Sequence, residues 1–442
     1  MLKRFKKGGI HPKENKISKD AAIEIAPLPK VAFISLSQHI GAPAEPLVKK
    51  GDTVKVGQLI GKAKGFISAN IHSSVSGTVK SVDDVVNGMG VSVPSITIDV
   101  EGDVWEDDID RSNDIITKCD LSAKEVVDCV AQADIVGLGG ATFPSNVKLS
   151  VPEGKKAEYL VVNGVECEPY LTADQHIMEE HSQEVIVAVD IISKSLGVKK
   201  AYIGIENNKP KAIASMVAAA GAYNNIEIVP LRVMYPQGGE KQLLDAILGR
   251  EIPSGALPLE VGAVVQNVGT IYAIYQALQK RKPLFERVVT VTGDHLKEPK
   301  NLLTRIGTPV KELIDFCGGL PEDTVKVVDG GPMMGRSVSN LEGVVNKGSS
   351  GVLIMSENKC DVSLESPCIR CGKCVGVCPM GLEPYLLNTL SDYHRFEDCK
   401  DHSVMDCIEC GSCSYTCPAH IRLLDNIRLA KREVAKLLRN KK

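Results

Sequence analysis

Two cysteine quartets near the C-terminal end constrain the fold more than any other feature of this chain. Residues 368–379 read CIRCGKCVGVCP and residues 407–418 read CIECGSCSYTCP, so both follow C-x₂-C-x₂-C-x₃-C-P. In bacterial-type ferredoxins this spacing lets three thiolates of a short loop converge on one [4Fe–4S] cluster, while the fourth binds the other cluster. We therefore predict two clusters, one bound by Cys368, Cys371, Cys374 and Cys417 and the other by Cys407, Cys410, Cys413 and Cys378.

The remaining cysteines give no competing metal pattern. Zinc is the alternative interpretation of any C-x₂-C pair, but two complete quartets, each followed by proline, favour clusters. Between the quartets, the stretch EPYLLNTLSDY predicts a helix, which indicates a helical ferredoxin-like domain. We predict that the six cysteines outside the quartets are small buried hydrophobes: Cys119, Cys129, Cys167, Cys317, Cys360 and Cys399.

The chain is too long for these clusters to be its only content. Its 442 residues predict two to four domains, and 43% hydrophobic with 24% charged residues is the profile of a globular protein. A net charge of −3 gives no reason to expect a nucleic-acid partner. No apolar run reaches the ~18 residues of a membrane helix, and the start MLKRFKKGG has no apolar segment typical of a secretion signal. We therefore expect a cytoplasmic protein that can still dock on a membrane.

The first third of the chain is rich in short β segments separated by turn residues. Residues 46–81 contain V-x-x-G-D-x-V-x-x-G-Q-x-I followed by S-S-V-S-G-T-V. This pattern resembles the biotinyl/lipoyl barrel-sandwich fold, with any other small β-barrel as the alternative. Members that carry a cofactor have a lysine at the hairpin tip, whereas this region reads GFISANIHS. We therefore expect an unmodified structural or docking domain.

The middle of the chain contains a glycine-rich segment, GLGGATFPSNVK, at residues 137–148. As a dinucleotide fingerprint it is a poor match, because Thr142 occupies the third glycine position and Pro144 interrupts the following helix. Its glycines nevertheless let backbone amides approach a phosphate or a ring, and Lys148 follows where it can neutralise a phosphate. The segments VVNGVECEP (161–169), YPQGGEKQLLDA (235–246) and VVQNVGT (264–270) each place polar residues after a predicted strand or before a helix, as in a ligand crevice.

Taken in this order, the four segments resemble the FMN- and NADH-binding subunit of respiratory complex I. The resemblance implies that Glu168 and Glu240 orient the nicotinamide or tune the flavin, and that Phe143 stacks on the adenine of NADH. It implies further contacts to FMN or nucleotide by Gly137, Gly139, Gly140, Lys148, Asn163, Glu166, Tyr235, Gly238, Gly239, Asn267 and Thr270. Three residues depart from the family pattern: Val165, Gly239 and Gln266 stand where that family has Asp, Glu and Asn.

The domain order narrows the family further. Residues 287–330 predict strand, turn, strand, helix and strand, and resemble the soluble-ligand-binding β-grasp (SLBB) domain. We predict a multidomain α/β and α+β protein with four parts: a barrel-sandwich β domain with its N-terminal segment (1–120), a Rossmann-like flavin/NADH α/β domain (121–285), a β-grasp domain (286–355) and a helical two-cluster domain (356–442). This order resembles the RnfC family, the C component of the Rnf complex, which is a membrane-bound ion-translocating ferredoxin:NAD⁺ oxidoreductase.

The resemblance implies a peripheral subunit on the cytoplasmic face of the cell membrane. Its cofactors would be FMN and two [4Fe–4S] clusters, its substrate NAD(H), and its partners other subunits including a ferredoxin-like iron–sulfur protein. The alternatives are a cobalamin reductase of bacterial microcompartments, whose barrel-sandwich domain lies at the C-terminal end, and a non-catalytic electron relay. The basic tail, residues 420–442, predicts an amphipathic helix that either binds lipid or a partner or packs on the cluster domain.

Overall fold

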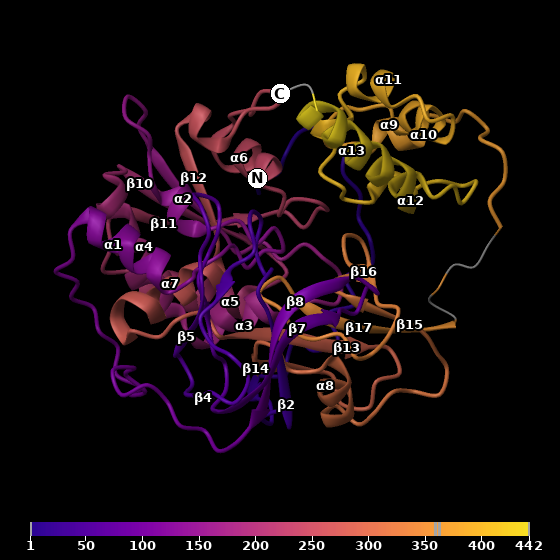
Figure 1. The fold of residues 1–442 in the computed structure, drawn as a ribbon. Helices are drawn as coiled ribbons and strands as arrows, with labels where there is room; N and C mark the ends of the chain where they lie inside the picture. Colours follow the sequence, from indigo (N-terminus) through magenta and orange to yellow (C-terminus); the bar gives the residue numbers. More distant parts are fainter. Residues whose placement is uncertain (1, 358–359, 361–363, 441–442) are drawn as a thin grey trace.

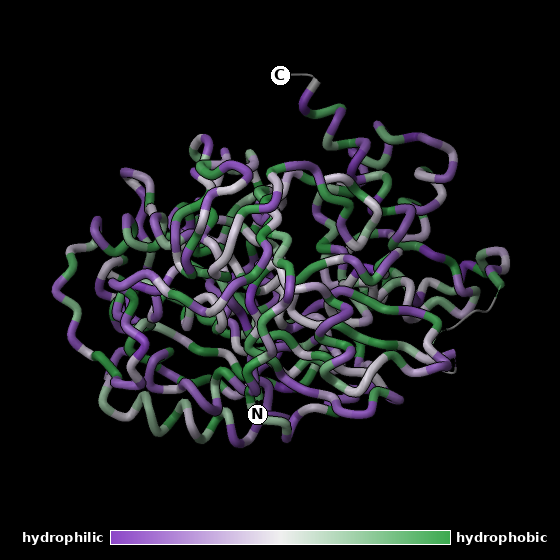
Figure 2. Tube along the Cα trace, turned by 60° about the horizontal axis from the view of Figure 1, so that its bottom comes forward, coloured by the Kyte–Doolittle hydropathy of each residue, from purple (hydrophilic) through white to green (hydrophobic). Residues whose placement is uncertain are grey.

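The computed structural model describes residues 2–357, 360 and 364–440. Lys441 and Lys442, the last two cations of the basic tail, lie outside the described residues. Figure 1 shows a broad main body and, at its upper right, a smaller lobe formed by the C-terminal residues. Along the tube in Figure 2, hydrophobic segments run through the interior of the main body. The multidomain α/β and α+β class predicted from the sequence is confirmed.

The barrel-sandwich domain consists of two small sheets around one apolar core. The four-stranded antiparallel sheet has the order β2-β8-β7-β4, formed by Val31–Ser35, Ser92–Val100, Gly77–Val86 and Thr53–Val54. The second sheet contains β3 (Glu45–Pro46), β5 (Leu59–Lys62) and β6 (Ile71–His72). Alternate residues of these strands, including Ile34, Ile60 and Ile98, are fully buried between the sheets.

The α/β domain that the sequence predicts to bind flavin, called the flavin domain below, is built on a four-stranded parallel sheet with the order β11-β10-β9-β12. Its strands are Ile226–Leu231, Lys200–Glu206, Tyr159–Asn163 and Ala263–Asn267. The chain builds outward from β9 to β11 and then returns to the other side of β9 for β12. The point between β9 and β12, where the order reverses, is the topological switch at which open α/β sheets bind ligands.

Helices cover both faces of this sheet. One face packs on α1 (Ala123–Gln132), α4 (Ser182–Leu196), α5 (Pro210–Ala220) and α7 (Val268–Lys280), with α3 (Ala173–Glu180) and the short α2 (Ser145–Leu149) beside them. The opposite face packs on α6 (Glu240–Leu248), near the 3₁₀ turn η1 (Pro258–Val261). The helix α1 begins with a capping box between Ser122 and Glu125.

The β-grasp domain contains a six-stranded mixed sheet and one helix. The order is β1-β14-β13-β17-β15-β16, formed by Ile23–Ile25, Lys300–Arg305, Glu286–Gly293, Gly351–Ser356, Thr324–Asp329 and Arg336–Ser337, with α8 (Val310–Phe316) packed on the core. The strand β1 comes from the N-terminal segment and pairs in parallel with β14. The sequence grouped residues 1–120 together, but the structure places residues 23–25 in this sheet.

The residues before β1 also lie outside the barrel-sandwich domain, and they run across the flavin domain. Phe5 is 2% exposed within the core beneath α6. Ile10 exchanges two backbone hydrogen bonds of 2.9 Å with Tyr235, and the amide of Gly9 donates to the carbonyl of Val377 in the first cysteine motif, also at 2.9 Å. The N-terminal segment therefore lies between the flavin domain and the cluster domain.

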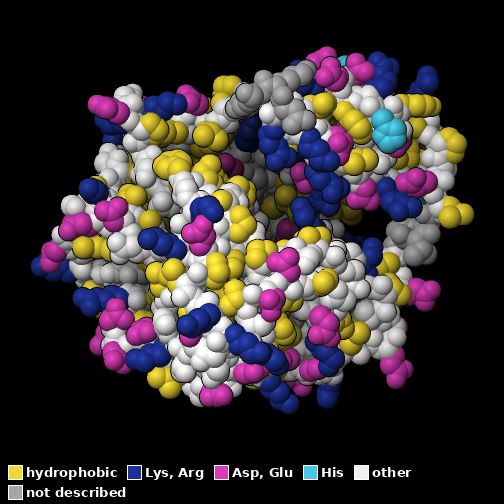
Figure 3. Space-filling model, in the orientation of Figure 1, with side chains coloured by type: hydrophobic (Ala, Val, Ile, Leu, Met, Phe, Trp, Pro, Cys, Tyr) yellow, Lys and Arg dark blue, Asp and Glu magenta, His cyan; other side chains and the backbone are white. Residues whose placement is uncertain are grey.

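The cluster domain is helical, as predicted. It contains α9 (Lys373–Gly376), α10 (Pro384–Asp392), α11 (Phe396–Asp401), η3 (Val404–Asp406), α12 (Ser412–Tyr415) and α13 (Leu423–Asn440). The helix α13 packs its apolar side on α10: Leu424, Ile427 and Val434 are buried, whereas Leu438 is 39% exposed. Figure 3 shows Lys and Arg side chains gathered over the region of α13. Among the described residues, none of the helices has the length and apolar character needed to cross a bilayer.

Two of the cysteines outside the quartets behave as predicted and four do not. Cys317 and Cys399 are buried in the β-grasp and cluster cores. The prediction is wrong for Cys119, Cys129, Cys167 and Cys360, which are partly exposed. Cys119 lies in the loop before α1 and packs on the flavin-domain core from outside, so its position follows from the loop path and not from any strand or helix periodicity.

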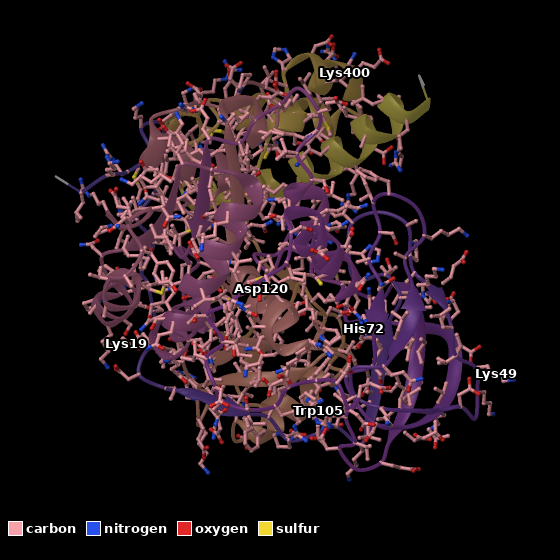
Figure 4. All side chains as sticks on the ribbon, turned by 90° about the vertical axis from the view of Figure 1, so that its left-hand side faces the viewer. Lys19, Lys49, His72, Trp105, Asp120 and Lys400 are labelled. Carbon is pink, nitrogen blue, oxygen red and sulfur yellow. The ribbon has the colours of Figure 1, made fainter. Side chains whose placement is uncertain are left out.

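A buried ionic contact joins the barrel-sandwich domain to the flavin domain and the β-grasp domain. Asp134, at the end of α1, lies 2.7 Å from the ammonium of Lys347 and 3.2 Å from His72 Nδ1. Lys347 and Asp134 are each 1% exposed, so neither charge is solvated. Burial lowers the pKa of Lys347, while Lys347 and His72 hold the pKa of Asp134 below its usual value against the opposing effect of burial. In Figure 4, His72 lies on the inner side of the barrel-sandwich domain and Lys49 at its outer edge.

Candidate cofactor sites

The structure gathers the eight quartet cysteines around two cavities. Cys368, Cys371, Cys374 and Cys417 line a cavity of about 460 Å³, and Cys378, Cys407, Cys410 and Cys413 line a smaller, more enclosed one. Each cavity therefore receives three cysteines from one motif and the last cysteine of the other. Among the described residues, no three His, Cys, Asp or Glu side chains are close enough to hold a single metal ion. Four thiols spread around a cavity suit a larger cluster.

The two cysteine groups differ in exposure. Cys368 and Cys371 are exposed, whereas Cys378, Cys410 and Cys413 are buried. Burial raises the pKa of Cys407 to about 11 and that of Cys413 to about 12. These buried sulfurs would bind as thiolates only beside a positively charged metal centre, which an iron–sulfur cluster supplies. We refer to the two groups as the outer quartet (368/371/374/417) and the inner quartet (378/407/410/413).

The two motifs fold alike at the backbone level. Arg370 and Glu409, at equivalent positions between the first two cysteines, have φ of 56° and 57°. Gly372 and Gly411, one residue after the second cysteine, have φ of 71° and 74° and precede α9 and α12. Glycine is the residue that takes this left-handed conformation at least cost. The repeated turns wrap each three-cysteine loop around its cavity.

The candidate flavin site lies at the switch point of the parallel sheet. Asn163 ends β9 and Asn267 ends β12, and the two are direct partners in the register of the strands. The side-chain amide of Asn163 donates to the carbonyl of Gly238 at 2.8 Å. Three of the four segments singled out in the sequence therefore meet at one edge of the sheet.

The glycine-rich segment, the fourth, packs against the same edge. The amide of Leu138 donates to Thr270 Oγ1 at 2.8 Å, and a Cβ added to Gly139 would lie 3.4 Å from Asn267. The loop is closed by the hydrogen bond from Gly137 N–H to the carbonyl of Phe143, and Gly140 has a φ of 102°. A side chain at Gly140 would be strained, although nothing lies within 4 Å of its added Cβ. The loop thus presents bare backbone to open space, as a phosphate or ring cradle requires.

The N-terminus of α7 adds polar groups to this edge. Asn267 caps the helix by accepting from the amides of Gly269 (2.9 Å) and Thr270 (3.2 Å), and it donates to Asp174 at 2.7 Å. Burial, together with the nearby carboxylate of Glu166, raises the pKa of Asp174 well above its usual value. The positive end of the α7 dipole and a carboxyl group with a raised pKa therefore lie side by side.

Lys148 and Glu240 face each other across the site. The ammonium of Lys148 lies 2.8 Å from Glu240 Oε1, and it also donates to the carbonyl of Val265 at 3.3 Å. The side chains are 32% and 37% exposed, so both remain accessible. Glu240 is the first residue of α6, where a carboxylate is favoured by the helix dipole. This lysine can exchange its protein carboxylate for a ligand phosphate.

Two polar side chains of these segments are buried without a partner. The amide nitrogen of Gln266 and the hydroxyl of Ser145 have no hydrogen bond among the described residues, although Gln266 is 2% and Ser145 0% exposed. Buried polar atoms without partners are costly and usually mark a missing water or ligand. Both atoms are fully enclosed by protein, so it is the exposed glycine loop and the partly exposed Lys148 that fit the phosphate of a bound flavin mononucleotide.

Glu166 and Glu168 form contacts within the protein that the sequence did not indicate. Glu166 accepts hydrogen bonds from the amides of Asp174 (2.8 Å) and Gln175 (3.2 Å) at the start of α3. Glu168 accepts from the amides of Met333 (3.2 Å) and Met334 (2.8 Å) in the loop before β16. Burial raises the pKa of Glu168 to about 7. Both carboxylates thus hold neighbouring backbone in place.

Tyr235, assigned from the sequence to the wall of the flavin site, also contacts the cluster domain. It is 1% exposed, and its hydroxyl donates to the carbonyl of Cys410 at 2.8 Å and lies 3.2 Å from Glu168 Oε1. Burial raises the pKa of Tyr235 well above its usual value. This contact joins the candidate flavin domain to the inner quartet.

Sequence reasoning missed Lys16. Its ammonium donates to the carbonyls of Glu166, Glu168 and Leu171, all in the loop after β9. Burial lowers the pKa of Lys16. No motif marks this lysine, because its role depends on the path of the N-terminal segment across the flavin domain.

Of the three residues that depart from the complex I pattern, Val165 is fully buried in the core beneath α6. Its carbonyl accepts from the buried ammonium of Lys209 at 2.8 Å. Gly239 caps α6, where an added Cβ would lie 2.4 Å from the side chain of Gln242. The apolar and small residues at these two positions therefore suit the packing of this chain.

Comparisons with known proteins divide the chain in the same order as the structure. Family models match residues 3–103 (RnfC barrel sandwich hybrid domain), 130–276 (Nuo51 FMN-binding domain), 288–337 (SLBB domain) and 360–418 (4Fe-4S dicluster domain). The chain is 49% identical over 436 residues, 98% of this chain and 94% of the relative, to the C component of the proton-translocating ferredoxin:NAD(+) oxidoreductase complex of Clostridium ljungdahlii. It is 46% identical over 430 residues, 97% of this chain and 96% of the relative, to the C component of the Na(+)-translocating complex of Acetobacterium woodii.

Among solved structures, the chain resembles an NAD+-reducing [NiFe]-hydrogenase in the air-oxidized state. The match has a TM-score of 0.50 at 16% sequence identity and covers 71% of this chain and 66% of that chain. At this identity the likeness concerns the fold alone.

Proposed function

The chain belongs to the RnfC family, the C component of ion-translocating ferredoxin:NAD(+) oxidoreductase (Rnf) complexes, and on this premise we propose that it passes electrons between ferredoxin-derived iron–sulfur carriers and NAD⁺. It is an oxidoreductase subunit with an FMN domain and a domain for two [4Fe–4S] clusters. Coupling to Na⁺ or H⁺ translocation belongs to other subunits of the complex.

The observation that carries the proposal is the meeting of three elements at one edge of the parallel sheet. The bare glycine loop, the capped start of α7 and Lys148 lie at the switch point between β9 and β12. The inner quartet touches this domain through Tyr235 and Cys410. A flavin, when bound, supplies the exchange between the two-electron chemistry of nicotinamide and the one-electron chemistry of clusters.

The residues of the chain then have distinct tasks. Lys148 neutralises the FMN phosphate, and the amides of the glycine loop close on it. Asn163, Asn267 and Thr270 hold the loops that frame the ring, while Glu240 keeps Lys148 oriented before the ligand arrives. Phe143 stacks on the adenine of NADH. Glu166 and Glu168 position the loop after β9 and are not required as acid–base groups.

The partners follow from the family and from exposure. The chain acts within a complex of several different proteins, as its relatives do. We place it at the cytoplasmic face of the membrane, with the exposed cysteines Cys368 and Cys371 toward an iron–sulfur partner.

Cofactor analysis of the anaerobically purified chain tests the proposal. We expect about eight iron and eight sulfide per chain and one FMN, because each [4Fe–4S] cluster contributes four of each. Replacing Cys374 should halve the iron, whereas replacing the buried Cys399, which belongs to neither quartet, should leave it unchanged. Purified chain that binds clusters but no FMN would overturn the proposed electron transfer to NAD⁺ and favour a relay.

A further inference from the structure

The contact between the two redox domains is centred on one tyrosine. Tyr235 precedes α6 in the flavin domain, and its hydroxyl lies 2.8 Å from the carbonyl oxygen of Cys410 in the inner quartet. Ile10, Tyr235 and Cys410 form a buried apolar cluster, with Met333 packed against it. In Figure 1 the cluster domain approaches the main body on the side where β16, which follows Met333, is located.

The position of this tyrosine is fixed from several directions. Its backbone is paired with Ile10 through two hydrogen bonds of 2.9 Å. The neighbouring Gly9 donates to Val377, and a Cβ added to Gly8 would lie 2.6 Å from the carbonyl of Cys378. Thus the N-terminal segment packs between Tyr235 and another cysteine of the same quartet. The hydroxyl cannot drift away from Cys410 without moving this segment.

Glu168 is the second partner of the hydroxyl. Its Oε1 lies 3.2 Å from the Tyr235 oxygen and accepts from Met334, while its Oε2 accepts from Met333. Lys16 stabilises the loop that carries Glu168 by donating three hydrogen bonds to its carbonyls. A hydroxyl has one hydrogen, and the shorter of its two contacts is the one to Cys410.

We propose that Tyr235 and Glu168 are positioning residues that set the redox equilibrium of the cluster bound by the inner quartet. The proposal rests on the proposed function, since it requires that Cys378, Cys407, Cys410 and Cys413 bind a [4Fe–4S] cluster. Neither residue is a ligand in this scheme. Tyr235 acts through its hydrogen bond to the backbone of Cys410, and Glu168 acts through its negative charge beside the Tyr235 hydroxyl.

The direction of each effect follows from charge. Reduction of a cluster adds one electron and forms or breaks no bond, so the site gains one negative charge. A hydroxyl that donates toward Cys410 places positive hydrogen near that charge and favours the reduced cluster. A carboxylate close by places negative charge there and disfavours it. Tyr235 therefore raises the equilibrium constant for reduction and Glu168 lowers it.

The outer quartet provides a comparison within the same molecule. Cys368 and Cys371 are exposed, and among the described residues no hydrogen bond from the flavin domain reaches the outer cysteines. Loss of the Tyr235 hydroxyl should therefore leave the outer cluster unaffected. A general loosening of the fold would change both clusters.

The test is an EPR-monitored redox titration of the full chain with both clusters bound, at pH 8.5. Cys413→Ser identifies which of the two one-electron steps belongs to the inner cluster. Tyr235→Phe removes only the hydroxyl, and we expect the inner step to become about five- to tenfold less favourable, ~40–60 mV at the one-electron conversion. Glu168→Gln replaces the carboxylate by a neutral amide and should shift the same step in the opposite direction.

The matched control is Tyr170→Phe. Tyr170 is also a buried tyrosine whose hydroxyl donates to another domain, to Asp294 at 3.0 Å, and none of its contacts among the described residues is with a cluster cysteine. The Tyr170→Phe variant should leave the reduction potentials of both clusters unchanged. An unshifted inner step in Tyr235→Phe, or equal shifts of both steps, would overturn the proposal. If Tyr235→Phe loses the inner cluster, Glu168→Gln decides, and an unshifted step there also overturns it. Failure of the proposed function is distinct, because wild-type chain would then lack FMN, or would lack the iron and EPR signals that this titration follows.

Discussion

Lys148 gives the sharpest single-residue test of the flavin site. We predict that Lys148→Met weakens FMN binding strongly while changing the stability of the fold little. The reason lies in the position of its ammonium, 2.8 Å from Glu240 on a side chain that is 32% exposed. A partly exposed ion pair contributes at most about 1 kcal/mol to folding, so its loss is tolerated.

The expected loss of affinity is larger. A charged hydrogen bond to phosphate contributes about 1.5–3 kcal/mol, which corresponds to roughly a ten- to hundredfold increase in Kd. Glu240→Gln should have a different effect, because it removes the carboxylate that competes with the phosphate for Lys148. We expect that variant to bind FMN as tightly as the wild type or up to about fivefold more tightly.

Quenching of FMN fluorescence on titration with flavin-free protein measures these affinities. The matched control is Lys155→Met, which breaks an exposed ion pair with Glu260 on the same domain and should leave the Kd unchanged. A Lys148→Met variant that binds FMN with the wild-type Kd would refute the assignment of this lysine to the phosphate.

Three further predictions concern the frame of the site. Asn267→Ala should lower the free energy of unfolding by about 2–4 kcal/mol in urea melts, because the α7 cap and the partner of Asp174 are both lost. Asn267→Ser should cost less, since serine can still cap the helix. Equal losses in the two variants would contradict this reasoning. Lys347→Met should cost about 3–5 kcal/mol, because it removes the cation nearest to the buried Asp134, at 2.7 Å, and leaves only His72 at 3.2 Å beside that carboxylate. Adding Asp134→Asn should recover part of this loss, and additive losses would contradict the reasoning. The pKa of Asp174 is raised in the folded protein, so its contribution to the free energy of unfolding is greatest below its ordinary pKa of about 4 and is lost as the pH rises through the raised pKa. Asp174→Asn should therefore flatten the pH dependence of the urea midpoint over that window. An unchanged pH dependence in this variant would contradict the prediction.

Local patterns in the sequence predicted most of the separate elements. The spacing of the quartets, the helix within residues 383–393 and the strand at the start of VVNGVECEP each depend on residues close together in the chain. Such elements follow from periodicity, capping and ligand spacing. The domain order then led to the correct family, which the relatives confirm.

The contacts between domains could not be predicted in this way. Ile23–Ile25 has no partner until β14, more than 270 residues later, completes the sheet. Lys16 looks like any surface lysine until the loop after β9 turns three carbonyls toward it. The contact between Tyr235 and Cys410 joins residues of two domains. These contacts depend on how the folded domains pack against one another, and a short stretch of sequence does not encode that packing.

The same limitation applies to the candidate site. The place of Glu168 at the nicotinamide stays a prediction, and nothing in the sequence indicated that its carboxylate accepts two backbone hydrogen bonds from the loop before β16. The sequence also gave no sign that Asp174 would pair with Asn267. The sequence motifs identified the segments that meet at the switch point. The contacts of their individual side chains depend on how the β-grasp and cluster domains pack around these segments.

An anaerobic NADH titration of the purified chain, loaded with FMN and both clusters, tests the central claim most directly. We expect NADH to bleach the flavin absorbance near 450 nm, on the order of one equivalent per chain for a two-electron transfer, and cluster EPR signals to grow as electrons redistribute. Chain that contains FMN and about eight iron but shows no bleaching at saturating NADH would contradict it.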